Sequence, residues 1–283
     1  MKRNKMLIVF AFVFVFVLYA LLCTFVYVKP ERFFYKPYDY FGNIKNVQDD
    51  VLDISEVEYY DYGNMKVKGW LYLNKSENSN SKVILFLHGN AYNLERYYHK
   101  LVPFADAGYS FFLPEYRGFG GQGVKIRQKF LTQDSLNAAK FLNQQGFANE
   151  NIVVYGMSLG AHNALHTVVN SQQNGKYNAL ILEVPFTSLP DAAKYHTTFK
   201  GVNLLPLDLL IKDKYNNSEL IKQIDTRLLV MTTKSDELIP YTQALNIYED
   251  APFPKEMVVY SGASHTTLYN LRNYLKIMEW LEK

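Results

Sequence analysis

Six short apolar runs, most of them separated by stretches of helical pattern, organise the chain from residue 83 onward. The runs are Val83–Leu87, Ser110–Leu113, Ile152–Tyr155, Ala179–Leu182, Leu228–Met231 and Met257–Tyr260. Runs of this length and composition are typical of strands that are buried on both faces. The helical patterns lie at Gln128–Gln145, Ala161–Val169, Tyr241–Glu249 and Leu271–Leu281. Strands that alternate with helices predict an α/β fold with a mostly parallel, twisted sheet and helices on both of its faces.

Two antiparallel strands are expected to open the sheet. Val57–Tyr62 and Met65–Leu73 alternate in polarity on either side of Gly63-Asn64, which is a hairpin signal. We assign the folded domain to residues 57–283, because about 250 residues suit one large α/β domain better than two small ones. Residues 29–56 are interpreted as an irregular connector.

One long segment breaks the alternation of strands and helices. Residues 186–226 contain Pro190, Gly201 and Pro206 and have only short amphipathic stretches. A long segment without regular structure is uncommon inside a compact domain and is usually functional or disordered. We therefore expect a small cap, at about residues 186–226, over the active edge of the sheet.

An uncharged apolar segment precedes the connector. Met6–Val28 has 23 residues, and as a helix it would span about 34 Å, enough for a hydrocarbon core of about 30 Å. A cleaved signal peptide is the alternative, but its apolar region is usually shorter and ends at a small-residue cleavage site. We therefore predict an uncleaved single-pass anchor over residues 1–28. Lys2, Arg3 and Lys5 precede it, which predicts a cytosolic N-terminus and a folded domain on the non-cytosolic side of the membrane.

The charge balance and the cysteine content exclude several classes of protein. The net charge is +3, and the three basic residues at the N-terminus account for it. The folded domain therefore has no basic block that could follow a phosphate backbone, and nucleic-acid binding is not expected. The single cysteine, Cys23, lies in the apolar segment, which excludes a disulfide framework and a cysteine nucleophile from the folded domain.

A sharp strand-to-helix turn is predicted at Gly156-Met157-Ser158-Leu159-Gly160, which fits the pattern Gly-x-Ser-x-Gly. The apolar run Ile152–Tyr155 comes directly before it, and a helical pattern comes directly after it. The glycines remove side chains that would clash at such a turn. The N-terminus of the following helix directs N–H groups at a developing oxyanion. Ser158 is therefore the candidate nucleophile, and a glycine-rich turn with a capping serine is the structural alternative.

A candidate acid and a candidate base follow Ser158 in the order used by hydrolases with this kind of turn. Asp236 stands shortly after the apolar run Leu228–Met231, at the carboxyl edge of the predicted sheet, where ligands of such sheets bind. Its neighbour Glu237 is the rival acid. His265 follows the last apolar run and is the candidate base. In a triad of this kind the imidazole takes the serine proton, and the acid orients the imidazole.

These motifs resemble the α/β-hydrolase superfamily over about residues 57–283. Five blocks stand in the order of that superfamily: Leu85–Ala91, Pro114–Gly120, Gly156–Gly160, Pro185–Ser188 and Ser235–Pro240. The chain looks similar to a small branch that has an N-terminal membrane anchor and an HGNA-type oxyanion loop and includes protein depalmitoylases and unassigned serine hydrolases. The resemblance implies triad roles for Ser158, Asp236 and His265. Gly120–Gly123 and Thr266-Thr267 depart from the branch at the rim of the site, so its substrate class does not carry over.

Two backbone N–H groups are assigned to the oxyanion hole. In this superfamily one donor is the residue after the nucleophile, here Leu159, and the other lies in the loop after the third strand. His88-Gly89-Asn90-Ala91 occupies that loop, and we assign the second donor to Asn90, with Ala91 as the alternative. His88 itself is interpreted as a structural histidine.

We therefore expect a membrane-anchored serine hydrolase that cleaves an acyl ester or thioester of a small-molecule or lipid-like substrate. The chemistry needs no metal or cofactor, and His162 and His166, four residues apart, are interpreted as a helix-surface pair rather than metal ligands. Acyl transfer or peptide cleavage by the same triad is one alternative. A non-catalytic anchored scaffold that keeps the fold is the other.

Overall fold

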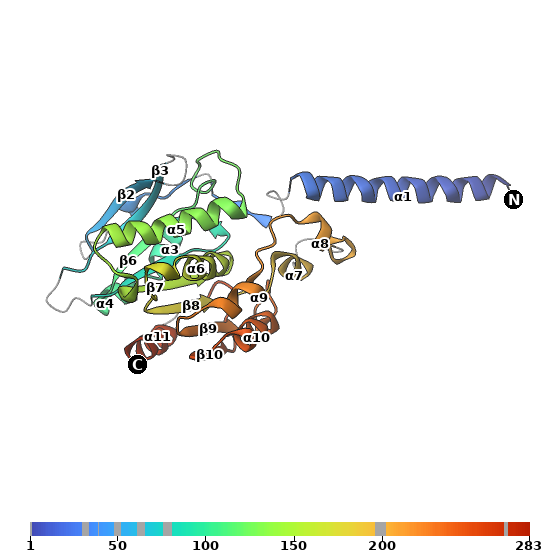
Figure 1. Cartoon of the computed structure of the whole chain (residues 1–283). Helices are drawn as coiled ribbons and strands as arrows, with labels where there is room; N and C mark the ends of the chain where they lie inside the picture. Colours follow the sequence, from blue (N-terminus) through green and yellow to red (C-terminus); the bar gives the residue numbers. More distant parts are fainter. Residues whose placement is uncertain are drawn as a thin grey trace.

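The computed structural model describes residues 2–29, 34–38, 40–47, 52–60, 66–75, 81–195, 202–268 and 271–283. An eight-stranded sheet lies at its centre (Figure 1). In order across the sheet, the strands are β10 (Lys255–Tyr260), β9 (Leu228–Thr233), β8 (Ala179–Glu183), β7 (Ile152–Met157), β4 (Val83–Leu87), β6 (Ser110–Pro114), β3 (Lys66–Tyr72) and β2 (Ile54–Tyr60).

The pairing of the strands confirms the predicted α/β fold. β3 pairs antiparallel with β2 and with β6, and the other neighbouring strands pair parallel. The sheet is therefore mostly parallel and opens with two antiparallel strands. The turn expected at Gly63-Asn64 lies outside the described residues.

Helices pack against both faces of the sheet. One face carries α5 (Gln128–Gln144), α6 (Leu159–Asn170) and α10 (Tyr241–Asp250). The other carries α3 (Leu94–Tyr98), α4 (Val102–Asp106) and α11 (Leu271–Glu282). Successive side chains of a strand point to opposite faces, so Leu85 of β4 joins the first core and Phe86 joins the second. All side chains of β4 are buried, which is why its sequence reads as an unbroken apolar run.

Two of these helices were not predicted from the sequence. α3 and α4 have five residues each, and five residues are too few to establish a helical repeat of apolar positions. They come between β4 and β6 in the chain, and together with α11 they cover one face of the sheet.

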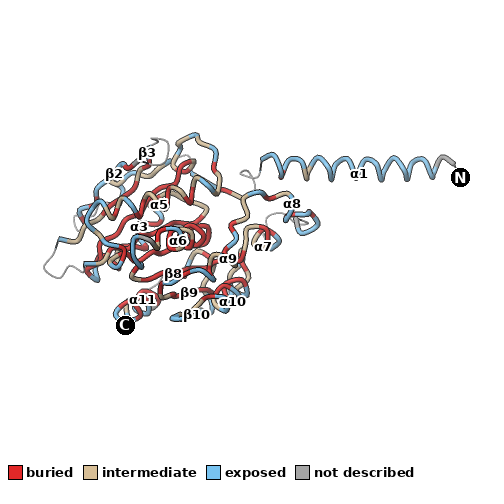
Figure 2. The backbone as a smooth tube through the Cα atoms, viewed as in Figure 1, coloured by how far each residue is buried: buried red, intermediate tan, exposed pale blue. Residues whose placement is uncertain are grey.

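The apolar N-terminal segment forms the helix α1 (Lys2–Val28), which projects away from the folded domain (Figure 1). It is exposed along most of its length (Figure 2). Asn4–Val28 is long and apolar enough to cross a membrane, by length and composition. Near its C-terminal end, Val26 is buried against Ala193, Leu205, Leu207 and Ile211 of the domain.

The connector is more ordered than the sequence indicated. It contains β1 (Lys36–Pro37), which pairs parallel with β5 (Ala91–Tyr92), and the 3-10 helix η1 (Ile44–Asn46). A strand of two residues has no alternation that a sequence pattern could reveal. The pairing brings the connector to the loop that follows β4.

The described residues of the segment 186–226 contain five short helices. They are α7 (Leu189–Lys194), η4 (Val202–Leu204), α8 (Leu207–Leu210), α9 (Asn217–Leu220) and η5 (Ile221–Gln223). Ser188 caps α7, because its hydroxyl accepts a hydrogen bond from the N–H of Asp191 at 3.2 Å.

This segment also covers His162 on α6, so the interpretation of that histidine as part of a surface pair was wrong. His162 is 2% exposed. Its Nδ1 donates to Asn217 Oδ1 at 2.7 Å, and its Nε2 accepts from Gln128 Nε2 at 2.9 Å. Burial lowers the pKa of His162 from 6.5 to about 3. The neutral imidazole therefore ties α9 to α5 across α6.

The buried imidazole should make stability depend on pH. Its pKa is about 3 in the folded chain and 6.5 in the unfolded chain, so the unfolded chain binds the extra proton between these values. The stability contributed by the neutral imidazole is fully present above pH 6.5. As the pH is lowered from 6.5 to 3, the free energy of unfolding should fall by up to about 1.4 kcal/mol per pH unit. Denaturant titrations of the full chain in detergent should show a shallower fall for His162→Gln. The exposed His99→Gln is the matched control, and equal slopes for parent and His162→Gln would contradict the assignment.

Candidate active site

Ser158 stands at the turn between β7 and α6. Its φ is 53° and its ψ is −113°, a positive-φ conformation that costs a non-glycine residue on the order of 1–3 kcal/mol. The turn is held in place because the N–H of Ser158 donates to the carbonyl of Glu183 on the neighbouring strand at 2.9 Å, and the carbonyl of Ser158 accepts from the N–H of Ala161 at 2.9 Å.

The two flanking glycines are required by close approach. A Cβ on Gly160 would lie 1.9 Å from the carbonyl oxygen of Leu87, at the end of β4, and a Cβ on Gly156 would lie 2.3 Å from the carbonyl oxygen of Gly160. Neither contact is possible for a side chain, so the start of α6 packs directly on the end of β4. This packing places the serine next to the loop that follows β4.

The structure brings Ser158, His265 and Asp236 together. The serine Oγ lies 3.0 Å from His265 Nε2, and His265 Nδ1 donates to Asp236 Oδ2 at 2.8 Å. Because a carboxylate can only accept, Nδ1 carries the ring proton and Nε2 is free to accept from the serine hydroxyl. All three side chains are almost fully buried.

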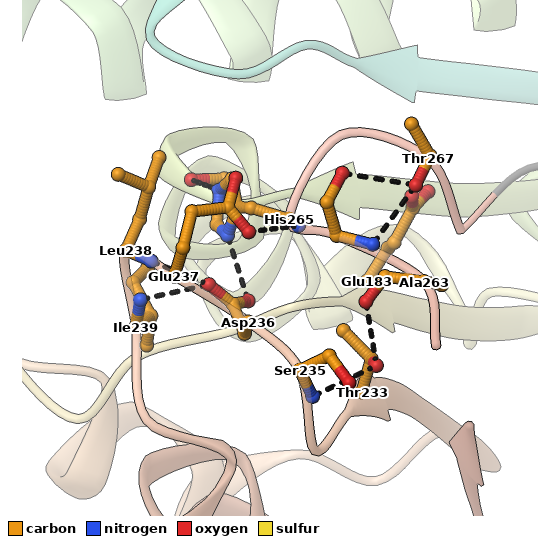
Figure 3. A network of polar contacts seen from close by, with 12 residues as sticks. Glu183, Thr233, Ser235, Asp236, Glu237, Leu238, Ile239, Ala263, His265 and Thr267 are labelled. Atoms are coloured by element: carbon orange, nitrogen blue, oxygen red, sulfur yellow. Dashed lines mark hydrogen bonds and ion pairs between the residues drawn. The ribbon is translucent and has the colours of Figure 1, made fainter. Parts of the chain in front are cut away.

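The carboxylates of Asp236 and Glu237 have different partners (Figure 3). Oδ1 of Asp236 accepts from the N–H groups of Leu238 and Ile239, at 2.9 and 2.8 Å, which fixes the carboxylate toward the imidazole. Oε2 of Glu237 accepts from the backbone N–H of His265 at 3.1 Å. Asp236 is therefore the acid that contacts the imidazole ring, and Glu237 bonds the backbone of the loop that carries His265.

The loop after β4 is anchored on both sides. Tyr97 donates its hydroxyl to the carbonyl of Ala91 at 2.7 Å, and burial raises the pKa of this phenol well above its usual range, so it remains a donor. Lys36 of β1 donates its N–H to the carbonyl of Asn90 at 3.3 Å. His88 is buried and bonds both the carbonyl of Gly89 and the carboxylate of Glu115, each at 2.8 Å.

A cavity of about 250 Å³ opens over these groups. Ser158, His265 and the two residues assigned as oxyanion donors, Asn90 and Leu159, line it. Leu159 is the first residue of α6, where N–H groups have no acceptor within the helix. Most of the remaining lining is apolar. It includes Phe34, Leu189, Ala192, Ala193, Leu238 and Ile239.

Sequence reasoning missed the contribution of the connector to this cavity. Phe34 and Lys36 both line it, although they lie outside the predicted domain and in no recognisable motif. Tyr97, on the unpredicted helix α3, also lines it. Among the described residues, no group of three histidine, cysteine, aspartate or glutamate side chains is placed to hold a metal ion.

Fold and sequence together define the class. The fold is that of an α/β-hydrolase. A family model described as the prolyl oligopeptidase family matches residues 95–283, which is more than half of the chain. The protein is a serine hydrolase. It belongs to the prolyl oligopeptidase family.

Similar proteins include esterases, lipases and peptidases. An uncharacterized protein of Mycobacterium tuberculosis is 30% identical over 71% of this chain and 68% of its own length. The lysophosphatidylserine lipase ABHD12 of Rattus norvegicus is 29% identical over 61% of this chain but only 46% of its own length. Among solved structures, the esterase Pf2001 of Pyrococcus furiosus has a TM-score of 0.67 and 20% identity, over 87% of this chain and 96% of its own. At that identity the likeness extends to the fold alone.

Substitution of each carboxylate in turn tests whether Asp236, and not Glu237, orients the imidazole of His265. Asp236→Asn should reduce kcat for p-nitrophenyl acetate by about 10⁴-fold, because an amide that donates to Nδ1 forces the wrong imidazole tautomer. Glu237→Gln should change kcat by less than about threefold, since its amide oxygen can still accept from the backbone N–H. Steady-state kinetics on both purified full-length variants checks this. Equal losses in the two variants would show that Asp236 has no special role.

Proposed function

We propose that this chain is a membrane-anchored serine hydrolase that cleaves an acyl ester or thioester through an acyl-enzyme on Ser158. One observation carries the proposal: a single imidazole bonds Ser158 Oγ at 3.0 Å and Asp236 Oδ2 at 2.8 Å, beneath a mainly apolar cavity. Residues 1–28 are the anchor in this proposal and residues 29–56 the connector. Residues 57–283 are the hydrolase domain, with the cap at 186–226.

The mechanism follows from the positions of these atoms. Ser158 Oγ attacks the acyl carbonyl carbon while its proton moves to His265 Nε2, and Asp236 stabilises the imidazolium through Nδ1. The N–H groups of Leu159 and Asn90 stabilise the oxyanion, each by about 3 kcal/mol. The imidazolium then gives its proton to the leaving alcohol or thiol as the bond to the acyl carbon breaks. Water, deprotonated by the imidazole, then attacks the acyl carbon of the acyl-enzyme. The bond to Ser158 Oγ breaks, the serine regains its proton from the imidazolium, and the carboxylic acid is released.

Two features support an acyl substrate of apolar character. The cavity has mostly apolar walls, which suit an acyl chain better than a charged group. Among the similar proteins, one is a lysophosphatidylserine lipase and another is an esterase. A thioester is included because the HGNA sequence of His88–Ala91 resembles the branch that contains depalmitoylases.

Peptide cleavage is the second candidate. The description of the matched family and the fold likeness to an acylaminoacyl peptidase of Pyrococcus horikoshii, with a TM-score of 0.66, favour it. The two candidates share the acyl-enzyme and differ in the leaving group, so matched substrates separate them. An N-acyl peptide p-nitroanilide turned over with a higher kcat/KM than the p-nitrophenyl ester of the same acyl group would favour the peptidase.

Removal of the nucleophile should abolish the reaction. Ser158→Ala should lower kcat for p-nitrophenyl acetate by about 10⁶-fold and abolish labelling by a fluorophosphonate probe. Ser218→Ala, which removes a hydroxyl on α9, is the matched control and should be labelled like the parent. Labelling of Ser158→Ala at the parental rate would rule out the proposed nucleophile, and so would an inert parent.

The membrane topology can be tested separately. Lys2, Arg3 and Lys5 before α1 favour a cytosolic N-terminus and a hydrolase domain on the other side. A reporter that is active only in the cytosol, fused after Lys283, should therefore be silent. An active reporter on an intact full-length fusion would reverse the orientation but would leave the hydrolase chemistry unaffected.

A further inference from the structure

The C-terminal end of α1 packs against the same short helices that wall the cavity. Val26 is buried in an apolar cluster with Ala193 of α7, Leu207 of α8 and two further residues, Leu205 and Ile211. Leu22, Cys23, Phe34, Leu189 and Leu210 surround it. We call these ten residues the anchor–cap cluster. Phe34, Leu189 and Ala193 belong both to this cluster and to the lining of the cavity over Ser158.

Next to this cluster, two large apolar side chains point into solvent. Leu204 of η4 is 76% exposed and Leu209 of α8 is 77% exposed. Tyr19 of α1 donates its hydroxyl to the carbonyl of Leu204 at 3.2 Å. Tyr19 stands about 14 Å before Val28 along the helix axis. Leu204 therefore lies beside the apolar length of α1, not beyond its end.

Polar groups mark the other edge of the same region. Lys212 places its Nζ 3.9 Å from the ring centroid of Tyr27, near the end of α1. A lysine paired with an aromatic ring is characteristic of the membrane–water interface. On α8, Asp208 pairs with Lys194 at 3.4 Å, and Lys194 also pairs with Asp191 of α7 at 3.0 Å. Leu209, the next residue of α8, is apolar and exposed.

We propose that Leu204 and Leu209 insert into the lipid leaflet in which α1 ends, so that the cavity over Ser158 takes the acyl chain of its substrate directly from the bilayer. This inference rests on the membrane anchoring in the proposed function and extends it to the route of the substrate. If α1 spans a bilayer, any group beside its apolar length must also lie in lipid. The exposed Leu204 at that depth, and the exposed Leu209 on the helix that follows it, are favourable in lipid and unfavourable in water. The path into the cavity is then short, because the anchor–cap cluster and the cavity share one wall.

The bilayer is favoured over a second protein as the partner of this face. The face continues the surface of α1, and its two leucines form a small patch rather than the extended interface that a stable dimer needs. Another exposed leucine, Leu275, is 56% exposed and belongs to α11. The helix α11 lies on the far side of the domain from α8 (Figure 1). Leu275 serves as a matched control for both experiments.

The first experiment measures the depth of Leu209 in the full chain, reconstituted in phosphatidylcholine nanodiscs. In a Cys23→Ala background, which leaves no other cysteine, Leu209→Cys or Leu275→Cys is labelled with an NBD fluorophore. We expect doxyl-labelled lipid to quench the label at residue 209 several-fold more than the label at residue 275. Equal quenching at the two positions would overturn the inference. Self-quenching that grows with protein density, without lipid quenching, would assign the face to a second copy and would also overturn it.

The second experiment compares two esters with one leaving group. In the same nanodiscs, the double variant Leu204→Glu, Leu209→Glu should hydrolyse bilayer-borne p-nitrophenyl palmitate about tenfold more slowly than the parent. It should hydrolyse water-soluble p-nitrophenyl acetate at the parental rate, which shows that the variant is folded and the triad intact. Leu275→Glu should change neither rate. Parental rates of the double variant on both esters would contradict the inference and leave the proposed hydrolase standing, whereas a parent inactive on both would refute the hydrolase itself.

Discussion

The packing of the start of α6 on the end of β4 is the constraint on which the rest of the site depends. Gly160 lets the start of α6 touch the end of β4, and Gly156 lets β7 pass close to α6, where a side chain would collide in each case. This contact holds Ser158 in a positive-φ conformation that an isolated turn would not keep. It also sets the serine beside the loop after β4, so one contact positions both the proposed nucleophile and the proposed oxyanion loop.

The other groups reach Ser158 because parallel strands end at the same edge of the sheet. Asp236 follows β9 and His265 follows β10, and these two strands are neighbours in register. Their loops are bonded to each other through Asp236 and Glu237, which accept from the ring and from the backbone of His265 respectively. The imidazole is thus held at two points before it meets the serine. Such preorganisation limits the entropy lost on the way to the transition state.

Much of this arrangement could be predicted from the sequence. The parallel strands β4, β6, β7, β8 and β9 are mainly apolar because both of their faces are covered, whereas the edge strand β10 is only partly buried. The bounds of all six strands were predicted to within two residues at each end. The strand-to-helix turn at Ser158 was predictable because an apolar run, the Gly-x-Ser-x-Gly pattern and a helical pattern stand in direct succession. The sequence did not decide whether Asp236 or Glu237 contacts the imidazole, because the side-chain directions of two adjacent loop residues cannot be read from it. In the structure, the N–H groups of Leu238 and Ile239 fix the direction of the Asp236 carboxylate.

Other parts depend on tertiary contacts that no local pattern carries. His162 looked like a surface residue because the segment that buries it comes far later in the chain. β1 lines the cavity with Lys36, yet its two residues have no periodicity, and it is ordered by pairing with β5. Helices as short as α3 draw their stability from packing rather than from their own propensity. The connector and the short helix α7 therefore both line the cavity, and the end of α1 packs beside them, in a way that only the folded structure reveals.

In the proposed mechanism, the hydroxyl of Ser158 becomes a nucleophile through its bond to one imidazole. Rapid-quench mass spectrometry during turnover of p-nitrophenyl acetate by the full-length protein tests this most directly. We expect an acetyl group on the peptide that contains Ser158, formed at least as fast as the steady-state turnover. Acetylation of a different residue, or turnover without any acylated peptide, would contradict it.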